Sequence, residues 1–201
     1  MDFSTRTVLR CFELRVPRDD SADSCEFVSF FVNRYLLAEL SPYFDTICFS
    51  EQFLEAQRGW AQIEDVYSDE LAVFLRYVCP NEKRHFDRVL DKSTLPTLLM
   101  LAYRFQTPCV LSDIERFFKD EVLPSQLEDW HKFALEMLLL SERYNPCSRV
   151  VINITRLLEG QGFDAKLSKK NGSLERLAPV VAPPMISSYH WDNFKYRHFY
   201  N

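Results

Sequence analysis

The apolar and polar positions of residues 7–16 alternate with a period of two, which predicts a β-strand. One face of this strand carries the apolar side chains Val8, Phe12, Leu14 and Val16, with Arg10 among them. The opposite face carries Glu13 and Arg15. The pattern therefore predicts a strand with one face in a hydrophobic core and the other in solvent.

Two further strands are predicted downstream of the first. Residues 25–32, CEFVSFFV, are apolar on both faces and rich in residues that favour strands, so we expect a buried central strand. The acidic segment 17–24 between the two strands predicts a loop, and hence a hairpin. Residues 58–66 predict a third, short strand after a break at Gly59, with Ile63 as its best core candidate.

Helical spacing replaces strand spacing at residues 68–78. Apolar residues recur there at i, i+3, i+4 and i+7, namely Leu71, Phe74, Leu75 and Val78. Ser68 is the expected N-cap, and the two acids that follow it suit the positive end of the helix dipole. Burial of each apolar side chain would stabilise the helix by about 1.5–3 kcal/mol.

The second half of the chain predicts two helical hairpins, each with a proline at its turn. Pro108 and Pro146 are each expected to end one helix and to begin the next. The apolar faces comprise Leu98, Leu101, Ala102 and Phe105 in the first hairpin and Trp130, Phe133, Ala134, Met137 and Leu138 in the second. Stripes of this kind usually pack in a core.

Composition narrows the classes of partner. With 201 residues, 47% of them hydrophobic, the chain can bury a substantial core. Its net charge of -5, without a dense run of Lys or Arg, argues against binding to nucleic acid or to an anionic membrane. Six scattered cysteines, with no signal peptide and no apolar run long enough to span a bilayer, favour a cytoplasmic or nuclear location.

Catalytic chemistry finds no support in the sequence. The four glycines form no phosphate-binding loop, and the four histidines form no zinc-ligand signature. No nucleophile motif surrounds a serine or cysteine. Glu64 and Asp65 are adjacent and would point to opposite faces of a strand, so they make no acid–base pair. We therefore expect no catalytic residue, no cofactor and no metal site, and hence no enzyme.

The order of elements in residues 32–78, from VNRYLLAELSPYF through FSEQFLEAQRGWAQIEDV to SDELAVFLRYV, resembles the central part of a BTB/POZ domain. The segment TLPTLLMLAYRFQTPCVLSDIERFF resembles the closing helical hairpin of that domain. The resemblance implies an α+β fold, a small β-sheet capped by helices and followed by a C-terminal helical extension. It implies a BTB/POZ domain at 7–120, a BACK-like extension at 121–160 and a Pro-containing, aromatic-rich tail at 161–201.

The resemblance also implies a partner. In BTB adaptors that bind a cullin, an apolar residue, any residue and a glutamate follow the second helix, and Phe53, Leu54 and Glu55 stand at that place here. Trp130 and Phe133, in the extension, are further candidates to face the cullin. The chain would then recruit an unknown ubiquitination substrate to a cullin-RING ubiquitin ligase.

Two alternatives stay open at this point. Phe53 would fold back onto its own domain and Glu55 would be a solvated charge if the chain were a scaffold for self-association or for a transcriptional co-regulator. Arg10 stands near a position where the family usually has an acid, and Asn33 with Arg34 replace its His and basic pair. Many members also have a helix before the first strand that contributes to dimerisation, and only about six residues precede the strand here, so a homo- or heterodimer is left open.

The tail contains an aromatic cluster after a proline-containing linker. Trp191, Phe194 and Tyr196 are candidates for a docking peptide, because Trp and Tyr are favoured anchors at interfaces. Alternatively the cluster packs back over the helical hairpins as a cap. The aggregation hazard of many exposed aromatic side chains favours the cap.

Overall fold

A computed structural model describes residues 2–18, 26–80, 86, 88–121, 127–145 and 148–160. The contacts between backbone positions group the chain into two units. The first unit comprises residues 1–89 and 97–112, and the second comprises residues 90–96 and 113–201. Helices and a small sheet make up the described residues, so the fold is α+β, as the sequence predicts.

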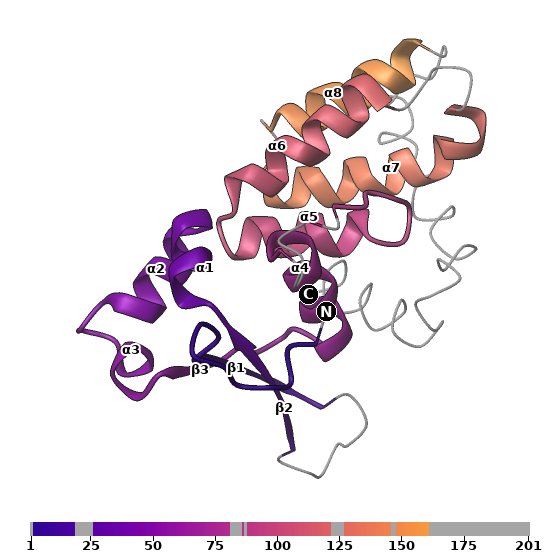
Figure 1. Ribbon diagram of the computed structural model, residues 1–201. Coiled ribbons are helices and arrows are strands. Elements are labelled where there is room, and N and C mark those ends of the chain that lie inside the picture. The colour runs from indigo at the N-terminus through magenta and orange to yellow at the C-terminus, as the bar shows by residue number, and fades with distance from the viewer. Residues whose placement is uncertain are drawn as a thin grey trace. The chain divides into compact units, whose positions relative to one another are not determined.

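The sheet belongs to the first unit and consists of β1 (Phe12–Pro17), β2 (Phe27–Val32) and β3 (Trp60–Gln62), in the order β2-β1-β3 among the described residues (Figure 1). β1 pairs antiparallel with β2, which confirms the predicted hairpin, and parallel with β3. The parallel pairing requires the long crossover through helices that separates β1 from β3 in the sequence.

The alternation of β1 places its two faces as predicted, except at its start. Phe12, Leu14 and Val16 are buried. Val8 was expected on the same face, and this expectation is wrong: Val8 lies outside the strand and is 95% exposed. Residues 7–10 instead form a turn, in which the amide of Arg10 donates to the Thr7 hydroxyl at 3.0 Å. The hydroxyl of Thr7 thus competes with strand pairing.

β2 is not the central strand that its apolar composition predicts. Among the described residues it lies at one edge of the sheet, and β1 is central. Phe30 and Val32 face the core, whereas Phe27 is exposed. The N-terminal segment covers part of this edge, since the Phe31 amide donates to the Phe3 carbonyl at 2.7 Å and the ring of Phe3 is buried.

Three helices lie between β2 and β3. They are α1 (Arg34–Leu40), α2 (Pro42–Phe49) and α3 (Leu54–Arg58). Asn33 caps α1 by accepting from two backbone amides, and Ser41 caps α2 by accepting from the Phe44 amide at 3.2 Å. Proline follows Ser41 at the first position of α2, where its fixed φ suits a helix start.

The predicted helix over residues 68–78 is confirmed as α4 (Ser68–Val78), and all four of its predicted core residues are buried. Ser68 is not the N-cap. The cap is Tyr67, whose amide donates to the Glu70 carboxylate at 3.0 Å. Because Glu70 lies three residues further on, its side chain reaches back to the cap and fixes the helix start one residue earlier than a serine cap would.

α5 (Leu95–Arg104) and α6 (Pro108–Arg116) confirm the first predicted helical hairpin, with Pro108 as the first residue of α6. The predicted face of α5 is buried and ends at Phe105, which lies at the centre of an aromatic cluster. Its ring centroid is 5.0 Å from that of Phe44 and 5.2 Å from that of Phe74. The buried hydroxyl of Ser41 donates to the Phe105 carbonyl. Helix α2 is thereby tied to the end of α5.

The second unit contains the π-helical turn η1 (Phe117–Glu121) and the helices α7 (Leu127–Tyr144) and α8 (Arg149–Gly160). α7 packs on α8, and α8 packs on η1. Ala134, Met137 and Leu138 are buried, as predicted, and the side-chain amide of Asn153 donates to the Glu115 carbonyl at 3.1 Å. Pro146, predicted to form the turn between α7 and α8, lies outside the described residues.

Candidate protein-docking site

The candidate site is the segment that joins α2 to β3, residues 50–59. α2 ends at Phe49, and the Phe53 amide then donates to the Ser50 carbonyl at 3.0 Å, which closes a tight turn. Phe53 is the N-cap of the short helix α3 and makes no side-chain capping bond. Gly59 ends the helix in the left-handed region, with φ of 76°, and passes the chain into β3. The loop predicted here is thus largely one helical turn.

Two apolar side chains at the start of α3 are exposed. Phe53 is 42% exposed and Leu54 is 64% exposed. No residue of α3 is buried. Exposed aromatic and aliphatic side chains at consecutive positions are a feature of docking surfaces more than of an isolated surface turn.

Glu55 lies in the first turn of α3, where its charge interacts favourably with the helix dipole. Its Oε1 atom is 3.3 Å from Nη2 of Arg58, one turn further along. The carboxylate also acts on Tyr43 of α2: burial raises the pKa of the Tyr43 phenol, and the charge of Glu55 raises it further, against the opposing effect of Arg104. The printed side-chain partner of Glu55 is thus Arg58 on its own helix, and its charge also reaches the Tyr43 phenol.

An exposed aromatic side chain, Tyr35, also lies on a helix that leads to the site. The ring of Tyr35, on α1, lies 5.1 Å from that of Phe49 at the end of α2, and Tyr35 is largely exposed. The guanidinium of Arg34 lies 4.9 Å from the centroid of the Phe49 ring. Such cation–π contacts favour the charged form, and hydrogen bonding to Tyr35 raises the pKa of Arg34.

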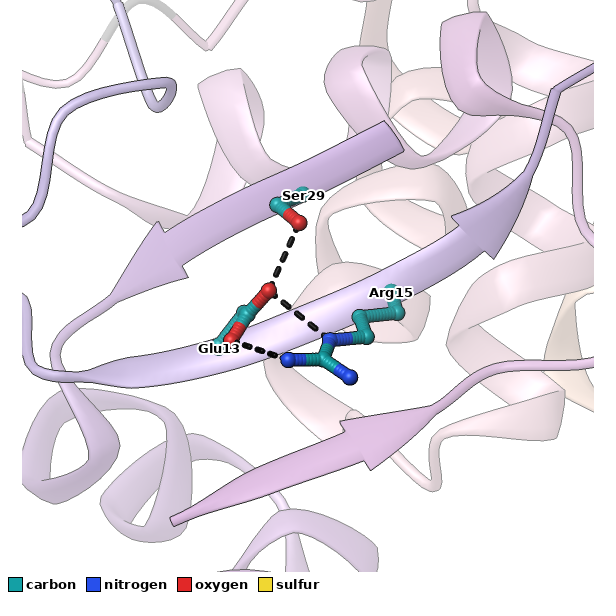
Figure 2. A network of polar contacts seen from close by, with 3 residues as sticks. All are labelled: Glu13, Arg15 and Ser29. Atoms are coloured by element: carbon teal, nitrogen blue, oxygen red, sulfur yellow. Dashed lines mark hydrogen bonds and ion pairs between the residues drawn. The ribbon is translucent and has the colours of Figure 1, made fainter. Parts of the chain in front are cut away.

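The solvent-facing side of the sheet carries a polar network (Figure 2). Nε and Nη2 of Arg15 donate to the two carboxylate oxygens of Glu13 at 2.8 and 3.0 Å, and the Ser29 hydroxyl donates to Glu13 Oε1 at 2.6 Å. The bond to Arg15 lowers the pKa of Glu13, burial opposes this effect, and the Ser29 bond adds to it. The predicted polar face of β1 is confirmed, but its internal pairing was not predicted.

Sequence reasoning missed Trp60 and Arg58 as parts of the site. The guanidinium of Arg58 lies 4.0 Å from the centroid of the Trp60 ring, and that of Arg15 lies 4.1 Å from it. Trp60 thus connects the sheet network to α3. Alternation within β3 could have indicated that Trp60 faces solvent, but no sequence signal identifies its two arginine neighbours.

The other predicted site residues lie elsewhere. Trp130 and Phe133 are on α7 in the second unit, where Phe133 is half-buried. The tail candidates Trp191, Phe194 and Tyr196 lie outside the described residues. Both sets stay predictions.

The described residues contain neither a cluster of metal ligands nor a helix suited to a bilayer. Within them, the side chains of His, Cys, Asp and Glu form no group of three that could hold a metal ion. No helix among them is long and apolar enough to cross a bilayer.

Comparison with known families identifies the fold. A family model of the BTB/POZ domain matches residues 24–121, and no curated protein matches the chain. The matched span contains β2, β3 and helices α1 to α6, including the whole candidate site. A small sheet capped by helices, with an exposed apolar turn, is thus the architecture of a protein-interaction module. This chain contains a BTB/POZ domain, a domain that mediates dimerisation and partner binding.

Proposed function

We propose that the chain is a substrate-recruiting adaptor of a cullin-RING ubiquitin ligase and that Phe53, Leu54 and Glu55 dock on the cullin. The observation that supports this proposal most is that the segment is exposed within a BTB/POZ domain. Phe53 and Leu54 are exposed at the start of α3, and Glu55 follows them with its carboxylate held by Arg58. An apolar anchor with an adjacent charge provides both binding energy and register at an interface.

The second unit adds to this proposal. In the cullin adaptors that the chain resembles, helices after the BTB domain extend the contact, and α7 and α8 occupy that place in the sequence. Trp130 and Phe133 would then contribute to binding. A Phe133→Ala variant should weaken binding by a smaller factor than substitutions in α3, and the two effects should add, because the residues lie on separate elements.

The test is titration of the purified chain with the N-terminal region of the cullin that BTB adaptors bind, followed by calorimetry. The Phe53→Ala/Glu55→Ala double variant should weaken binding at least tenfold, since substitution of one central interface residue often costs about 2 kcal/mol or more. Val8→Ala/Glu26→Ala is the matched control, because it removes an exposed apolar residue and an exposed acid elsewhere. It should leave the affinity unchanged.

Two results would contradict the proposal. Folded wild-type chain that does not bind at micromolar concentration would exclude a cullin adaptor and leave a BTB scaffold for self-association or co-regulator binding. Equal losses in the double variant and its control would place the cullin contact outside α3.

A further inference from the structure

The register of the sheet aligns four side chains on its solvent face. Glu13 of β1 lies opposite Trp60 of β3, and Arg15 of β1 lies opposite Ser29 of β2. Residues opposite each other on neighbouring strands point to the same face, as do residues two apart on one strand. Glu13, Arg15, Ser29 and Trp60 therefore share the face that points away from the buried side chains of β1.

The indole ring of Trp60 is in contact with two guanidinium groups. Arg15 approaches from the sheet, with its Cζ atom 4.1 Å from the ring centroid, and Arg58 approaches from α3 at 4.0 Å. Both guanidinium groups are therefore within the range of a cation–π contact with this ring.

Both arginines are also held at their outer ends by carboxylates. Arg15 donates to both carboxylate oxygens of Glu13, which in turn accepts from Ser29. Arg58 pairs with Glu55 at 3.3 Å. The contacts thus run without a break from β2, through the solvent face of the sheet and the Trp60 ring, to the acidic residue of the candidate docking site.

The geometry of α3 makes this connection important. A helix of five residues is far too short to be stable alone, so its side-chain positions depend on contacts outside the helix. None of its residues is buried, and Gly59 at its end provides no side chain. Trp60, the next residue, is half-buried and contacts Arg58 directly. It is the nearest rigid strand position to which the end of α3 is attached.

We propose that Trp60 is a positioning residue for the docking site: its ring holds the Arg58 guanidinium, and Arg58 holds the Glu55 carboxylate in the orientation in which a partner binds it. This inference rests on the proposed cullin contact. A partly exposed glutamate such as Glu55 loses side-chain entropy when it binds, and holding it beforehand reduces that cost.

The pairing with Arg58 leaves Glu55 able to bind a partner. Arg58 contacts Oε1, and the second oxygen, Oε2, accepts no hydrogen bond from a described residue. A carboxylate can accept several hydrogen bonds, so a donor of the partner can use Oε2 while Arg58 stays in place. Arg58 therefore orients the carboxylate without competing for all of it.

The test is a double-substitution cycle measured by calorimetry against the same cullin N-terminal region. The four chains are wild type, Trp60→Leu, Glu55→Gln and the combination of both. Trp60→Leu should weaken binding about fivefold in the wild-type background but less than twofold in the Glu55→Gln background, because its effect passes through Glu55. Trp60→Phe keeps an aromatic ring for Arg58 and should restore most of the affinity.

A second variant distinguishes a loss of positioning from a loss of folding. Arg58→Lys keeps the charge on an exposed side chain but replaces the planar group that stacks on Trp60, so it should leave the fold unchanged and weaken binding about threefold, again only while Glu55 is present. Urea unfolding of each variant provides the check on folding.

The outcomes separate the two proposals. If wild type binds and the effects of Trp60→Leu and Arg58→Lys are the same in both backgrounds, the positioning role is wrong while the cullin contact stands. If folded wild type does not bind, the proposed function fails and the positioning role fails with it. Non-additive losses that depend on Glu55, with rescue by phenylalanine, support the inference.

Discussion

The strongest test of the sheet network is the substitution Glu13→Gln. Glutamine has nearly the same shape as glutamate but carries no charge, and its amide group would present a donor where Arg15 now finds an acceptor. The Ser29 hydroxyl can still donate to the remaining oxygen of the side chain. The substitution therefore removes the bond from Arg15 Nη2 at 3.0 Å and takes the negative charge from the acceptor of the bond at 2.8 Å, while it preserves packing.

Burial determines the size of the effect. A hydrogen bond to a charged group contributes about 1.5–3 kcal/mol, whereas a fully exposed ion pair contributes about 0.2–1 kcal/mol. The Glu13 side chain is 18% exposed, but that of Arg15 is 35% exposed, so solvent screens the pair in part. We expect Glu13→Gln to lower the free energy of unfolding by about 1–2 kcal/mol at pH 7, between these two limits.

The effect should disappear in acid. The bond to Arg15 lowers the pKa of Glu13 in the folded chain, so the folded state binds a proton less readily than the unfolded state. The resulting stabilisation is fully present above the ordinary glutamate pKa, about 4.3, and is lost as the pH falls through the lower pKa of the folded state. Wild type and Glu13→Gln should therefore approach equal stability in acid.

Urea unfolding at a series of pH values from 7 down to 3.5 measures this difference. At pH 7 the midpoint should fall by about 0.5–1 M, with the slope unchanged. Glu26→Gln is the control, because Glu26 pairs with Arg18 where both side chains are more than half exposed, and it should cost less than about 0.5 kcal/mol. A loss for Glu13→Gln that is the same at every pH would refute the reasoning.

Three further predictions concern the core, the end of α3 and the cysteines. Phe74→Ala should cost about 3–5 kcal/mol in urea unfolding, because it removes a fully buried ring from the aromatic cluster; a cost below 1 kcal/mol would contradict this packing. Gly59→Ala should cost about 1–2 kcal/mol from its positive φ alone, since a Cβ there would meet no atom within 4 Å, and Gly59→Asn should cost less. Burial raises the pKa of Cys48 and of Cys79 to about 12, so mass spectrometry after iodoacetamide treatment at pH 8 should find both unmodified in the folded chain and modified in urea; equal labelling in both states would be the contrary result.

Local patterns account for most of the elements. The period of two in β1 and the i, i+3, i+4, i+7 spacing of α4 predict both the element and its buried face, because side-chain direction follows from backbone geometry alone. Pro108 and Gly59 mark boundaries for the same reason, since each restricts or permits particular φ values at its own position.

The predictions that proved wrong concern positions where more than one residue or hydrogen bond could satisfy the same local pattern. Val8 continues the alternation of β1, yet the Thr7 hydroxyl bonds to the backbone and turns the chain. Both Ser68 and Tyr67 could precede α4, and the reach of Glu70 decides between them. Such competition depends on side-chain hydrogen bonds that periodicity does not report.

Local sequence patterns could not predict the order of the strands in the sheet. The apolar composition of β2 suits a central strand as well as an edge strand, and its place at the edge depends on the parallel pairing of β1 with β3, whose residues follow some 45 positions later. The partial cover provided by Phe3 explains how so apolar a strand is tolerated there.

The sequence by itself determined most of the elements, because these depend on neighbours within a few residues. The resemblance to BTB/POZ domains gave the α+β class and the position of Phe53, Leu54 and Glu55 after a helix. Only the tertiary structure decided that Trp60 contacts both Arg15 and Arg58 and that Arg58 pairs with Glu55. The first of these contacts requires the register of two strands far apart in the chain. Register is set by the pairing and burial of whole strands, which no single stretch of sequence specifies.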